Sequence, residues 1–131
     1  MALVFPKPPK QNASQIEWEQ WFEKLYLRLR LFLLTGHETS GDSNSTISAN
    51  VSYHGVTALT TGRTKTLPAA SDLTDGHVLI VQDESGSAGS NNITISRAGT
   101  DTINGSTSVS ISTNYGRATL IKRGSGKYFS A

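Results

Sequence analysis

Residues 76–96 decide the fold of this chain, and they read GHVLIVQDESGSAGSNNITIS. The stretch holds an apolar run at 77–81, a polar Gly/Ser/Asn loop at 82–92 and an alternating run at 93–96. Both runs have the composition of β-strands, so together with the loop they predict a hairpin-like unit. The first run is apolar at consecutive positions, which indicates that both of its faces are covered, whereas the second predicts one solvated face. A strand covered on both faces needs partners, and in so polar a region we expect some of them to come from other chains.

The composition predicts a mainly β domain around this unit. The chain has 131 residues, of which 36% are hydrophobic and 17% are charged, so it is neither rich in core residues nor highly charged. Ser, Thr, Asn and Gly dominate residues 41–131, which favours short strands and tight turns. The regular spacing of the runs predicts a small antiparallel β sandwich or barrel over residues 47–131. We expect strands at Ile47–Tyr53, Val56–Thr60, Thr64–Leu67, His77–Gln82, Ile93–Ser96, Ser108–Ser112, Arg117–Lys122 and Lys127–Phe129.

One amphipathic helix is predicted before the β domain, over residues 14–34. Ser14 followed by Glu17 is a capping box, which marks the start of the helix. The stripe of apolar residues that follows has heptad spacing, and it either packs on the chain's own β domain or packs on copies of itself around a threefold axis or in a partner's groove. Leucine at every odd position from 25 to 33 leaves a strand over residues 27–34 as an alternative. The stripe consists of Trp18, Phe22, Leu25, Leu29 and Phe32, and Trp21 widens it.

Two segments without regular structure are predicted beside the helix. Residues 1–13 form an extended arm, because Pro6, Pro8 and Pro9 fix their φ angles and favour a polyproline conformation. The arm is either a loose chain terminus or an anchor that lies along another protein, with Phe5 as its buried side chain. Residues 35–46 form a polar linker into the β domain.

Candidate catalytic and metal-binding residues are few. The histidines at positions 37, 54 and 77 lack metal-ligand spacing, and the chain has no cysteine. Asp83, Glu84 and Asp101 are expected to be turn and loop residues, and no nucleophile or phosphate-binding motif is present. We therefore expect no enzyme activity, no cofactor and no metal.

The charge and the apolar tracts also exclude several classes of partner. The net charge is only +2, and the basic residues are scattered without an aromatic platform, so no nucleic-acid partner is expected. The longest apolar tract, residues 25–34, is too short for a membrane span and contains two arginines. No signal-peptide pattern precedes Pro6, so we expect synthesis in a cytoplasm.

Five short segments occur in order along the β region: TLPAA at 66–70, GHVLIVQDESG at 76–86, NNITI at 91–95, GTDTING at 99–105 and NYG at 114–116. This ordered set resembles a β module found in virion structural proteins of tailed bacteriophages, over about residues 64–129. The chain departs from that pattern at its last hairpin, where Gly-Lys-Tyr-Phe stands in place of a common asparagine and tryptophan. The first 40 residues are similar to short N-terminal anchors of phage appendage proteins.

The resemblance implies a homotrimer that belongs to the virion. Because so short a chain lacks a long shaft, it implies a capsid decoration or cement protein that stabilises or ornaments the head, with the major capsid protein or another virion protein as partner. The alternative is a short tail fibre, adaptor or glycan-binding appendage with a host surface glycan as partner; an exposed cluster of Tyr53, Tyr115, Tyr128 and Phe129 would favour it. A glycan-cleaving enzyme is the third and most distant option. Val78 and Ile80 are expected in the trimer core, and the anchoring residues are expected to be Phe5, Pro6, Pro8, Pro9, Trp18, Trp21, Phe22, Leu25, Leu29 and Phe32.

Overall fold

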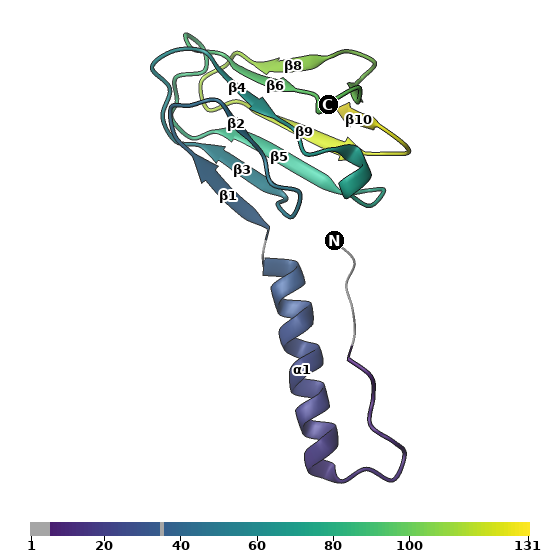
Figure 1. Ribbon diagram of the computed structural model, residues 1–131. Coiled ribbons are helices and arrows are strands. Elements are labelled where there is room, and N and C mark those ends of the chain that lie inside the picture. The colour runs from purple at the N-terminus through teal and green to yellow at the C-terminus, as the bar shows by residue number, and fades with distance from the viewer. Residues whose placement is uncertain (1–5, 35) are drawn as a thin grey trace. The chain divides into compact units, whose positions relative to one another are not determined.

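The computed structural model describes residues 6–34 and 36–131, with side chains at residues 6–27 and 36–131. The chain divides into two compact units, Ala2–Gly36 and His37–Ala131. The first unit contains helix α1 (Gln15–Leu34), and the second contains strands and one short 3-10 helix, η1 (Ala70–Asp72) (Figure 1). The strands are β1 (His37–Ser40), β2 (Ser45–Thr46), β3 (Tyr53–Val56), β4 (Arg63–Thr66), β5 (Val78–Asp83), β6 (Ile93–Ser96), β7 (Thr102–Ile103), β8 (Ser108–Ile111), β9 (Arg117–Lys122) and β10 (Lys127–Ser130).

The strands of the second unit form two mixed sheets. The six-stranded sheet has the order β1-β3-β5-β9-β10-β7, and the four-stranded sheet has the order β2-β4-β6-β8. From β1 to β6 the chain places successive strands in alternate sheets, so β1, β3 and β5 are parallel neighbours, and so are β2, β4 and β6. This is a winding with two strands per turn, as in β-solenoids. Strands β8 and β9 then pair antiparallel with β6 and β5, and β10 pairs antiparallel with β9.

The mainly β fold with one N-terminal helix agrees with the sequence, but the expectation of a purely antiparallel domain is wrong. The prediction that residues 76–96 form a hairpin-like unit is wrong as well, because β5 lies in the six-stranded sheet and β6 in the four-stranded sheet. The loop between them crosses from one sheet to the other. Alternation along a short strand determines which face is buried, but it does not determine which strand becomes the neighbour. A crossing loop and a reversing loop therefore have the same sequence pattern.

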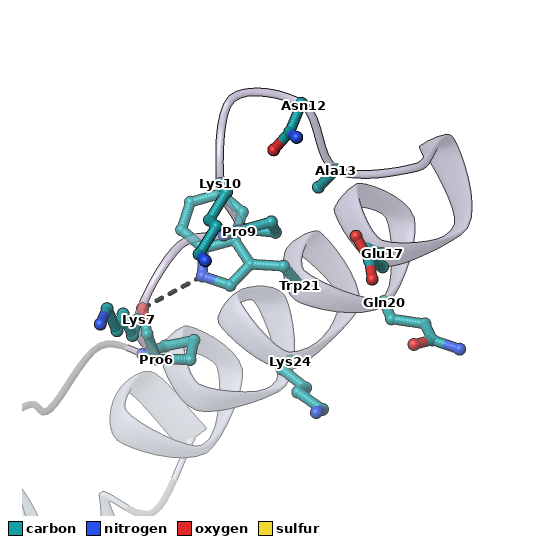
Figure 2. A pocket seen from close by; sticks show the side chains of 10 residues that line it. All are labelled: Pro6, Lys7, Pro9, Lys10, Asn12, Ala13, Glu17, Gln20, Trp21 and Lys24. Atoms are coloured by element: carbon teal, nitrogen blue, oxygen red, sulfur yellow. Dashed lines mark hydrogen bonds between the residues drawn. The ribbon is translucent and has the colours of Figure 1, made fainter.

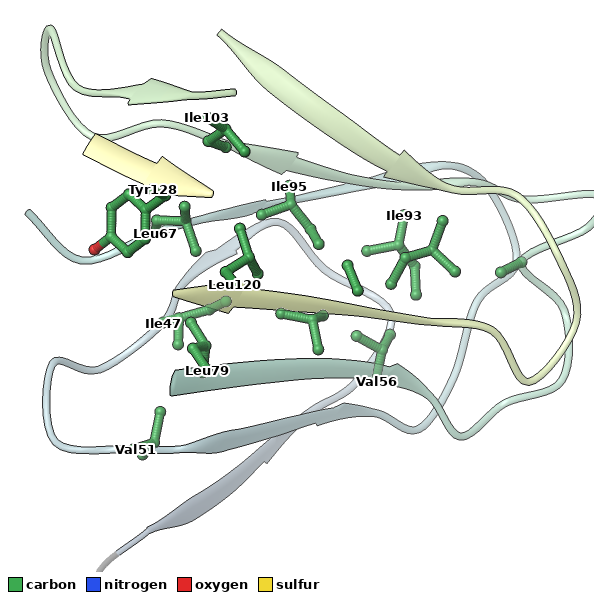
Figure 3. Close-up of a cluster of buried hydrophobic side chains, with 14 of the residues drawn as sticks. Ile47, Val51, Val56, Leu67, Leu79, Ile93, Ile95, Ile103, Leu120 and Tyr128 are labelled. Atoms are coloured by element: carbon green, nitrogen blue, oxygen red, sulfur yellow. The ribbon is translucent and has the colours of Figure 1, made fainter. Parts of the chain in front are cut away.

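A single cluster of buried side chains joins the two sheets (Figure 3). On β5 the side chains alternate, with Leu79 and Val81 buried in the core while Val78 remains 40% exposed and Ile80 is half-buried. The consecutive apolar run therefore has only one face covered by its own chain. The core consists of Ile47, Val51, Val56, Leu59, Leu67, Ala70, Leu73, Leu79, Val81, Ala88, Ile93, Ile95, Ile103, Ile111, Ala118, Leu120 and Tyr128.

Most predicted strands lie where the sequence places them. The bounds of β6 and β9 are as predicted, those of β4 and β5 are shifted by one residue at both ends, and those of β8 and β10 differ by one residue at the last position. The strands predicted at Ile47–Tyr53 and Val56–Thr60 are wrong, because a turn at residues 49–50 interrupts the first and β3 ends at Val56. Residues 35–46, expected as a linker, include β1 and β2. Both strands pair with their neighbours through the backbone and consist of Ser, Thr, Glu and His, so no apolar alternation reveals them in the sequence.

Helix α1 begins with the predicted capping box. The Ser14 amide donates to Glu17 Oε2 at 3.1 Å, and the Glu17 amide donates to Ser14 Oγ at 3.3 Å. The helix continues to Leu34, so residues 27–34 are helical and the strand alternative is wrong. Leucine and arginine favour helix, and the segment lacks the β-branched residues that strands prefer.

The buried carboxylate of Asp83 organises the loop that crosses between the sheets. Asp83 is the last residue of β5 and is 0% exposed. Its Oδ1 accepts hydrogen bonds from the Ser85 amide (3.0 Å), the Ser85 hydroxyl (2.6 Å) and the Gly86 amide (3.1 Å). Its Oδ2 accepts from the amides of Ala88 and Tyr115, both at 3.0 Å. One side chain thus fixes both the crossing loop and the turn that leads into β9.

The hydrogen bonds also determine the charge state of Asp83. Burial alone would raise the pKa of this carboxyl, but hydrogen bonds from Ser85, Ala88 and Tyr115 outweigh burial and hold the pKa below its ordinary value. A carboxyl whose pKa is lower in the folded chain stabilises the fold above its unfolded pKa. That stabilisation is lost as the pH falls through the folded pKa.

We predict that Asp83→Asn lowers the free energy of unfolding by about 3 kcal/mol at neutral pH, because a buried charged acceptor is lost and an NH₂ group faces amide donors. The difference from the wild type should shrink as the pH is lowered below about 4, where the unfolded-state carboxyl binds a proton. Urea unfolding followed by circular dichroism measures both effects. The matched control is Asp72→Asn at an exposed aspartate of η1. An Asp83→Asn protein as stable as this control would contradict the assigned role.

Candidate functional site

The N-terminal unit holds its arm against its own helix. The Trp21 indole N–H donates to the Pro6 carbonyl oxygen at 3.0 Å, and the Ala13 amide donates to the Lys10 carbonyl oxygen where the chain turns (Figure 2). Between arm and helix lies an open cavity of about 720 Å³. The prolines therefore follow the helix instead of extending freely. The cavity is lined by Pro6, Lys7, Pro9, Lys10, Asn12, Ala13, Glu17, Gln20, Trp21 and Lys24.

The helix presents a large aromatic surface. The ring centroids of Trp18 and Trp21 are 5.7 Å apart, and that of Phe22 lies 4.9 Å from Trp21 and 6.1 Å from Trp18. Phe22 is 57% exposed, and Ile16 is 65% exposed. No residue between 6 and 27 is fully buried. Apolar side chains gain stability when water is removed from them, so burial against a further surface would stabilise this unit.

The structure places the predicted anchoring residues at different levels of burial. Pro6, Pro9, Trp18, Trp21 and Leu25 are half-buried. Pro8 and Phe22 are exposed. Phe5 and the side chains of Leu29 and Phe32 lie outside the residues that the structure describes. The hydrogen bond from Trp21 to Pro6 joins the arm and the helix stripe, and the sequence did not predict this contact.

The outer face of the six-stranded sheet carries a second apolar surface. Val78 on β5 pairs with Ile121 on β9, and Ile121 pairs with Phe129 on β10. These three side chains, which we call the apolar row, are 40%, 40% and 50% exposed. Ile80, the other residue predicted in the trimer core, is half-buried on the same face. The alternation along residues 117–122 could have revealed Ile121, but its alignment with Val78 depends on the pairing of strands.

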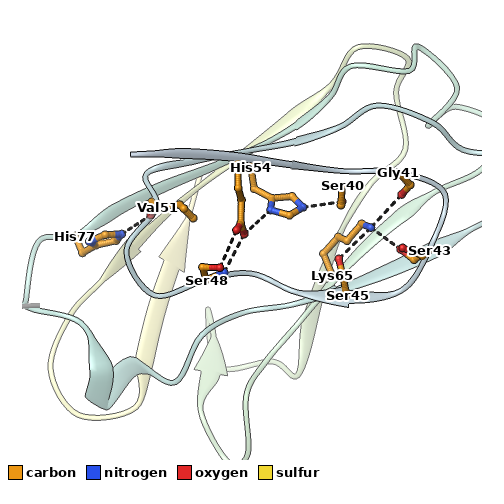
Figure 4. Close-up of polar contacts among 10 residues, drawn as sticks. Ser40, Gly41, Ser43, Ser45, Ser48, Val51, His54, Lys65 and His77 are labelled. Carbon is orange, nitrogen blue, oxygen red and sulfur yellow. Dashed lines mark hydrogen bonds and ion pairs between the residues drawn. The ribbon is translucent and has the colours of Figure 1, made fainter. Parts of the chain in front are cut away.

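Glu38, Ser40 and His54 have the geometry of a serine hydrolase triad. Ser40 Oγ lies 2.9 Å from His54 Nε2, and His54 Nδ1 lies 2.9 Å from Glu38 Oε1 (Figure 4). The same Glu38 accepts hydrogen bonds from the amide (2.9 Å) and the hydroxyl (2.7 Å) of Ser48. His54 is only 2% exposed. The hydrogen bonds of Ser48 extend the cluster to the segment that follows β2, so Glu38 and His54 connect β1, β3 and that segment.

This cluster is therefore best explained as a clamp on the edge strand β1. Burial alone would raise the pKa of Glu38, but hydrogen bonds from Ser48 and His54 outweigh it and hold the pKa below its ordinary value. Glu38 thus remains charged at neutral pH and accepts all three hydrogen bonds. The clamp explains how a segment as polar as β1 joins the sheet.

Lys65 forms a second polar clamp on the same region. Its side chain is 0% exposed, and its Nζ donates to the Ser43 carbonyl oxygen, to Ser45 Oγ (3.2 Å) and to the Gly41 carbonyl oxygen (3.4 Å) (Figure 4). Burial lowers the pKa of this lysine, because desolvation disfavours the charged form. The connection from β1 to β2 wraps around the ammonium group, so the predicted linker is an ordered part of the domain.

The four aromatic residues that could have indicated sugar binding do not form one cluster. Tyr128 is 1% exposed and donates its hydroxyl to the Pro68 carbonyl oxygen at 2.6 Å. Phe129 belongs to the apolar row, near the start of β5. Tyr115 is 68% exposed and lies near the other end of β5, where its amide bonds to Asp83. Tyr53 is half-buried on β3.

Comparisons with known proteins leave the geometry as the basis for the function. No protein-family model matches the sequence, and no curated protein matches it significantly. Among the residues that the structure describes, no helix is long and apolar enough to cross a membrane. Within the same residues, no group of three His, Asp or Glu side chains is arranged to hold a metal ion.

We predict that His54→Phe lowers the free energy of unfolding by about 2–4 kcal/mol, because Glu38 and Ser40 lose their shared partner in a buried setting. The control is His77→Phe, where a half-buried ring makes one hydrogen bond, at 2.8 Å to the Val51 carbonyl oxygen, and the expected loss is about 1 kcal/mol. Urea unfolding followed by circular dichroism measures both losses. Equal losses in the two variants would show that the clamp contributes nothing beyond a single hydrogen bond.

Proposed function

We propose that this protein is a homotrimeric bacteriophage virion protein that decorates or cements the capsid. The observation that carries the proposal is the exposed aromatic stripe of α1. The Phe22 side chain is 57% exposed, and none of the helix side chains that the structure describes is buried. A helix with this much apolar surface is stable in water only when a partner covers it. The resemblance of residues 64–129 to a phage β module suggests the kind of assembly.

The spacing of the stripe suggests that the partners are copies of the same helix. Trp18, Phe22 and Leu25 are separated by four and three residues, which is the heptad period of a coiled coil. A closed symmetric assembly lets each copy cover the stripe of the next one. The apolar row on the β domain offers a further self-complementary surface. Val78 and Ile80 would then occupy the trimer interface.

The arm suggests how such a trimer attaches to a particle. The hydrogen bond from the Trp21 indole N–H to the Pro6 carbonyl oxygen holds the arm against the helix. Lys7, Lys10 and Lys24 line the cavity between arm and helix together with a single acidic residue, Glu17. A segment of the major capsid protein that enters this cavity would meet an aromatic ring and several ammonium groups. In this proposal the β domain remains outside and ornaments the head.

We predict that the purified protein sediments as a trimer, with three times the 14.1 kDa mass of the chain. Phe22→Glu should weaken association by about 100-fold or more, because an unpaired carboxylate buried in a helix seam costs at least about 3 kcal/mol. Gln20→Glu is the matched control, since it adds the same charge two residues away and outside the seam. Analytical ultracentrifugation measures the masses. A wild-type monomer would refute the trimer, and equal effects of the two variants would place the interface elsewhere.

We predict that deletion of residues 1–10 abolishes binding to capsids assembled without the protein and leaves the β domain folded. Trp21→Phe should weaken binding without abolishing it, because the ring stays apolar while the hydrogen bond to Pro6 is lost. Co-sedimentation with capsids measures binding, and circular dichroism verifies the fold. Full binding by the deletion variant would show that the arm is not the anchor. Counting copies on the virion separates the roles, because a decoration protein covers the head and a tail protein occurs in few copies.

A further inference from the structure

The side chain of Asn104 binds the end of strand β10 much as a neighbouring strand would. Its Oδ1 accepts a hydrogen bond from the Ser130 amide at 3.0 Å, and its Nδ2 donates to the Ser130 carbonyl oxygen at 3.2 Å and to Ser130 Oγ at 2.9 Å. The Asn104 amide donates to the Tyr128 carbonyl oxygen at 2.9 Å. Strand β7 ends at Ile103, so the Asn104 carboxamide continues its pairing with β10 by one further step.

A carboxamide satisfies both halves of this contact, whereas a carboxylate does not. The Ser130 amide is a donor and the Ser130 carbonyl oxygen is an acceptor, so the partner must offer one acceptor and one donor. Asn104 offers both in a single planar group, and the contact with Ser130 fixes which way that group points. An aspartate carboxylate offers acceptors only, and it would place a charged oxygen against the Ser130 carbonyl oxygen.

Asn104 also belongs to the only Asn-Gly pair in the sequence. The pair forms a two-residue turn, in which the Ile103 and Ser106 amides each donate to the other residue's carbonyl oxygen at 2.8 Å. Asn104 and Gly105 have φ angles of 51° and 78°, and this combination is typical of a type I′ turn. Both residues are exposed, and a Cβ atom added at Gly105 would meet no atom within 4 Å. Water therefore reaches this turn freely.

We propose that Asn104 is a self-modification site, at which the chain deamidates and thereby releases the end of β10. The Gly105 amide nitrogen loses its proton and attacks Asn104 Cγ, the bond from Cγ to Nδ2 breaks, and the nitrogen leaves as ammonia with that proton. A water molecule then opens the resulting cyclic imide, which gives aspartate or isoaspartate at position 104. Glycine after the asparagine favours the attack, because no side chain hinders the approach of its nitrogen.

The contact with Ser130 controls when this reaction occurs. The attack requires the carboxamide to leave Ser130 and to turn toward the Gly105 nitrogen. The three hydrogen bonds to Ser130 therefore keep Asn104 unreactive while β10 is docked, and local opening of the chain end makes it reactive. Once ammonia has left, the donor to the Ser130 carbonyl oxygen is gone, and β10 cannot dock in the same way.

The product would also disturb the apolar row. Phe129 lies between Tyr128 and Ser130 on β10, and it pairs with Ile121 on β9. Release of the end of β10 would free Phe129 from this alignment and would add one negative charge nearby. The site does not depend on the proposed assembly, because Asn104 and Ser130 belong to one β domain. A monomeric protein would deamidate at the same position.

The test follows deamidation in the full-length protein by mass spectrometry of its peptides during incubation at mildly alkaline pH. Asn104 should react faster than Asn50, an exposed asparagine followed by a valine. Ser130→Pro removes the amide hydrogen and the hydroxyl group and should speed the reaction by about tenfold or more. Ser130→Ala is the matched control, because it removes the hydroxyl group alone and should speed the reaction by about fivefold at most. The Ser130 amide donates to Asn104, so neither variant removes a bond to β9.

A second experiment measures the effect of the product on β10. Asn104→Asp reproduces one product and should speed hydrogen exchange of residues 127–131 by about tenfold or more, because the carboxylate faces the Ser130 carbonyl oxygen. Asn104→Gly is the matched control, since it tolerates the positive φ and removes the carboxamide without adding a charge. It should speed exchange by a smaller factor.

Three results would overturn the inference. The first is that Asn104 deamidates no faster than Asn50 in Ser130→Pro protein whose circular dichroism matches the wild type, which would leave the contact as a structural clamp only. The second is that the wild type and both Ser130 variants deamidate at the same rate, which would show that β10 does not protect Asn104. The third is unchanged hydrogen exchange in Asn104→Asp. If Ser130→Pro fails to fold, the comparison of Ser130→Ala with the wild type decides the second point.

Discussion

The fold of the β domain depends on one buried carboxylate, that of Asp83. Its five hydrogen bonds reach forward into the crossing loop and across to the turn before β9. The carboxylate oxygens accept hydrogen bonds from the loop amides. Buried amides without a partner would cost free energy. The chain can therefore leave the six-stranded sheet at the end of β5 and enter the other sheet without exposing its backbone. Pairing of the loop amides within the domain thus helps β5 and β6 to lie in different sheets.

Buried polar groups supplement a modest apolar core throughout the domain. Lys65 and His54 are as inaccessible as the core aliphatic residues, and each is surrounded by hydrogen-bond partners. No buried side-chain nitrogen or oxygen among the described residues lacks a partner. A network in which every member is satisfied specifies one arrangement, since any shift leaves a charge or a dipole unpaired. This explains how a sequence with 36% hydrophobic residues can form a defined domain.

The parts of the fold that were predictable are those encoded by local patterns. The capping box of Ser14 and Glu17 and the alternation in β6 and β9 involve neighbouring residues, so their signals lie within a short window. The sheet to which β5 and β6 belong depends on contacts made by Asp83, and β1 depends on a clamp from His54, so neither has a local signal. The hydrogen bond between Tyr53 and Glu84 was missed for the same reason, because the two residues meet only where β3 and β5 are neighbours in one sheet.

The two ends of strand β5 differ in chemistry. At its start, Val78 continues the apolar row toward Ile121 and Phe129, a surface that gains stability when another copy covers it. At its end, Asp83 and Gln82 bond the backbone of Tyr115, and polar groups of this kind are costly to remove from water. Burial of the apolar row against a further surface would therefore leave the polar end of β5 in water.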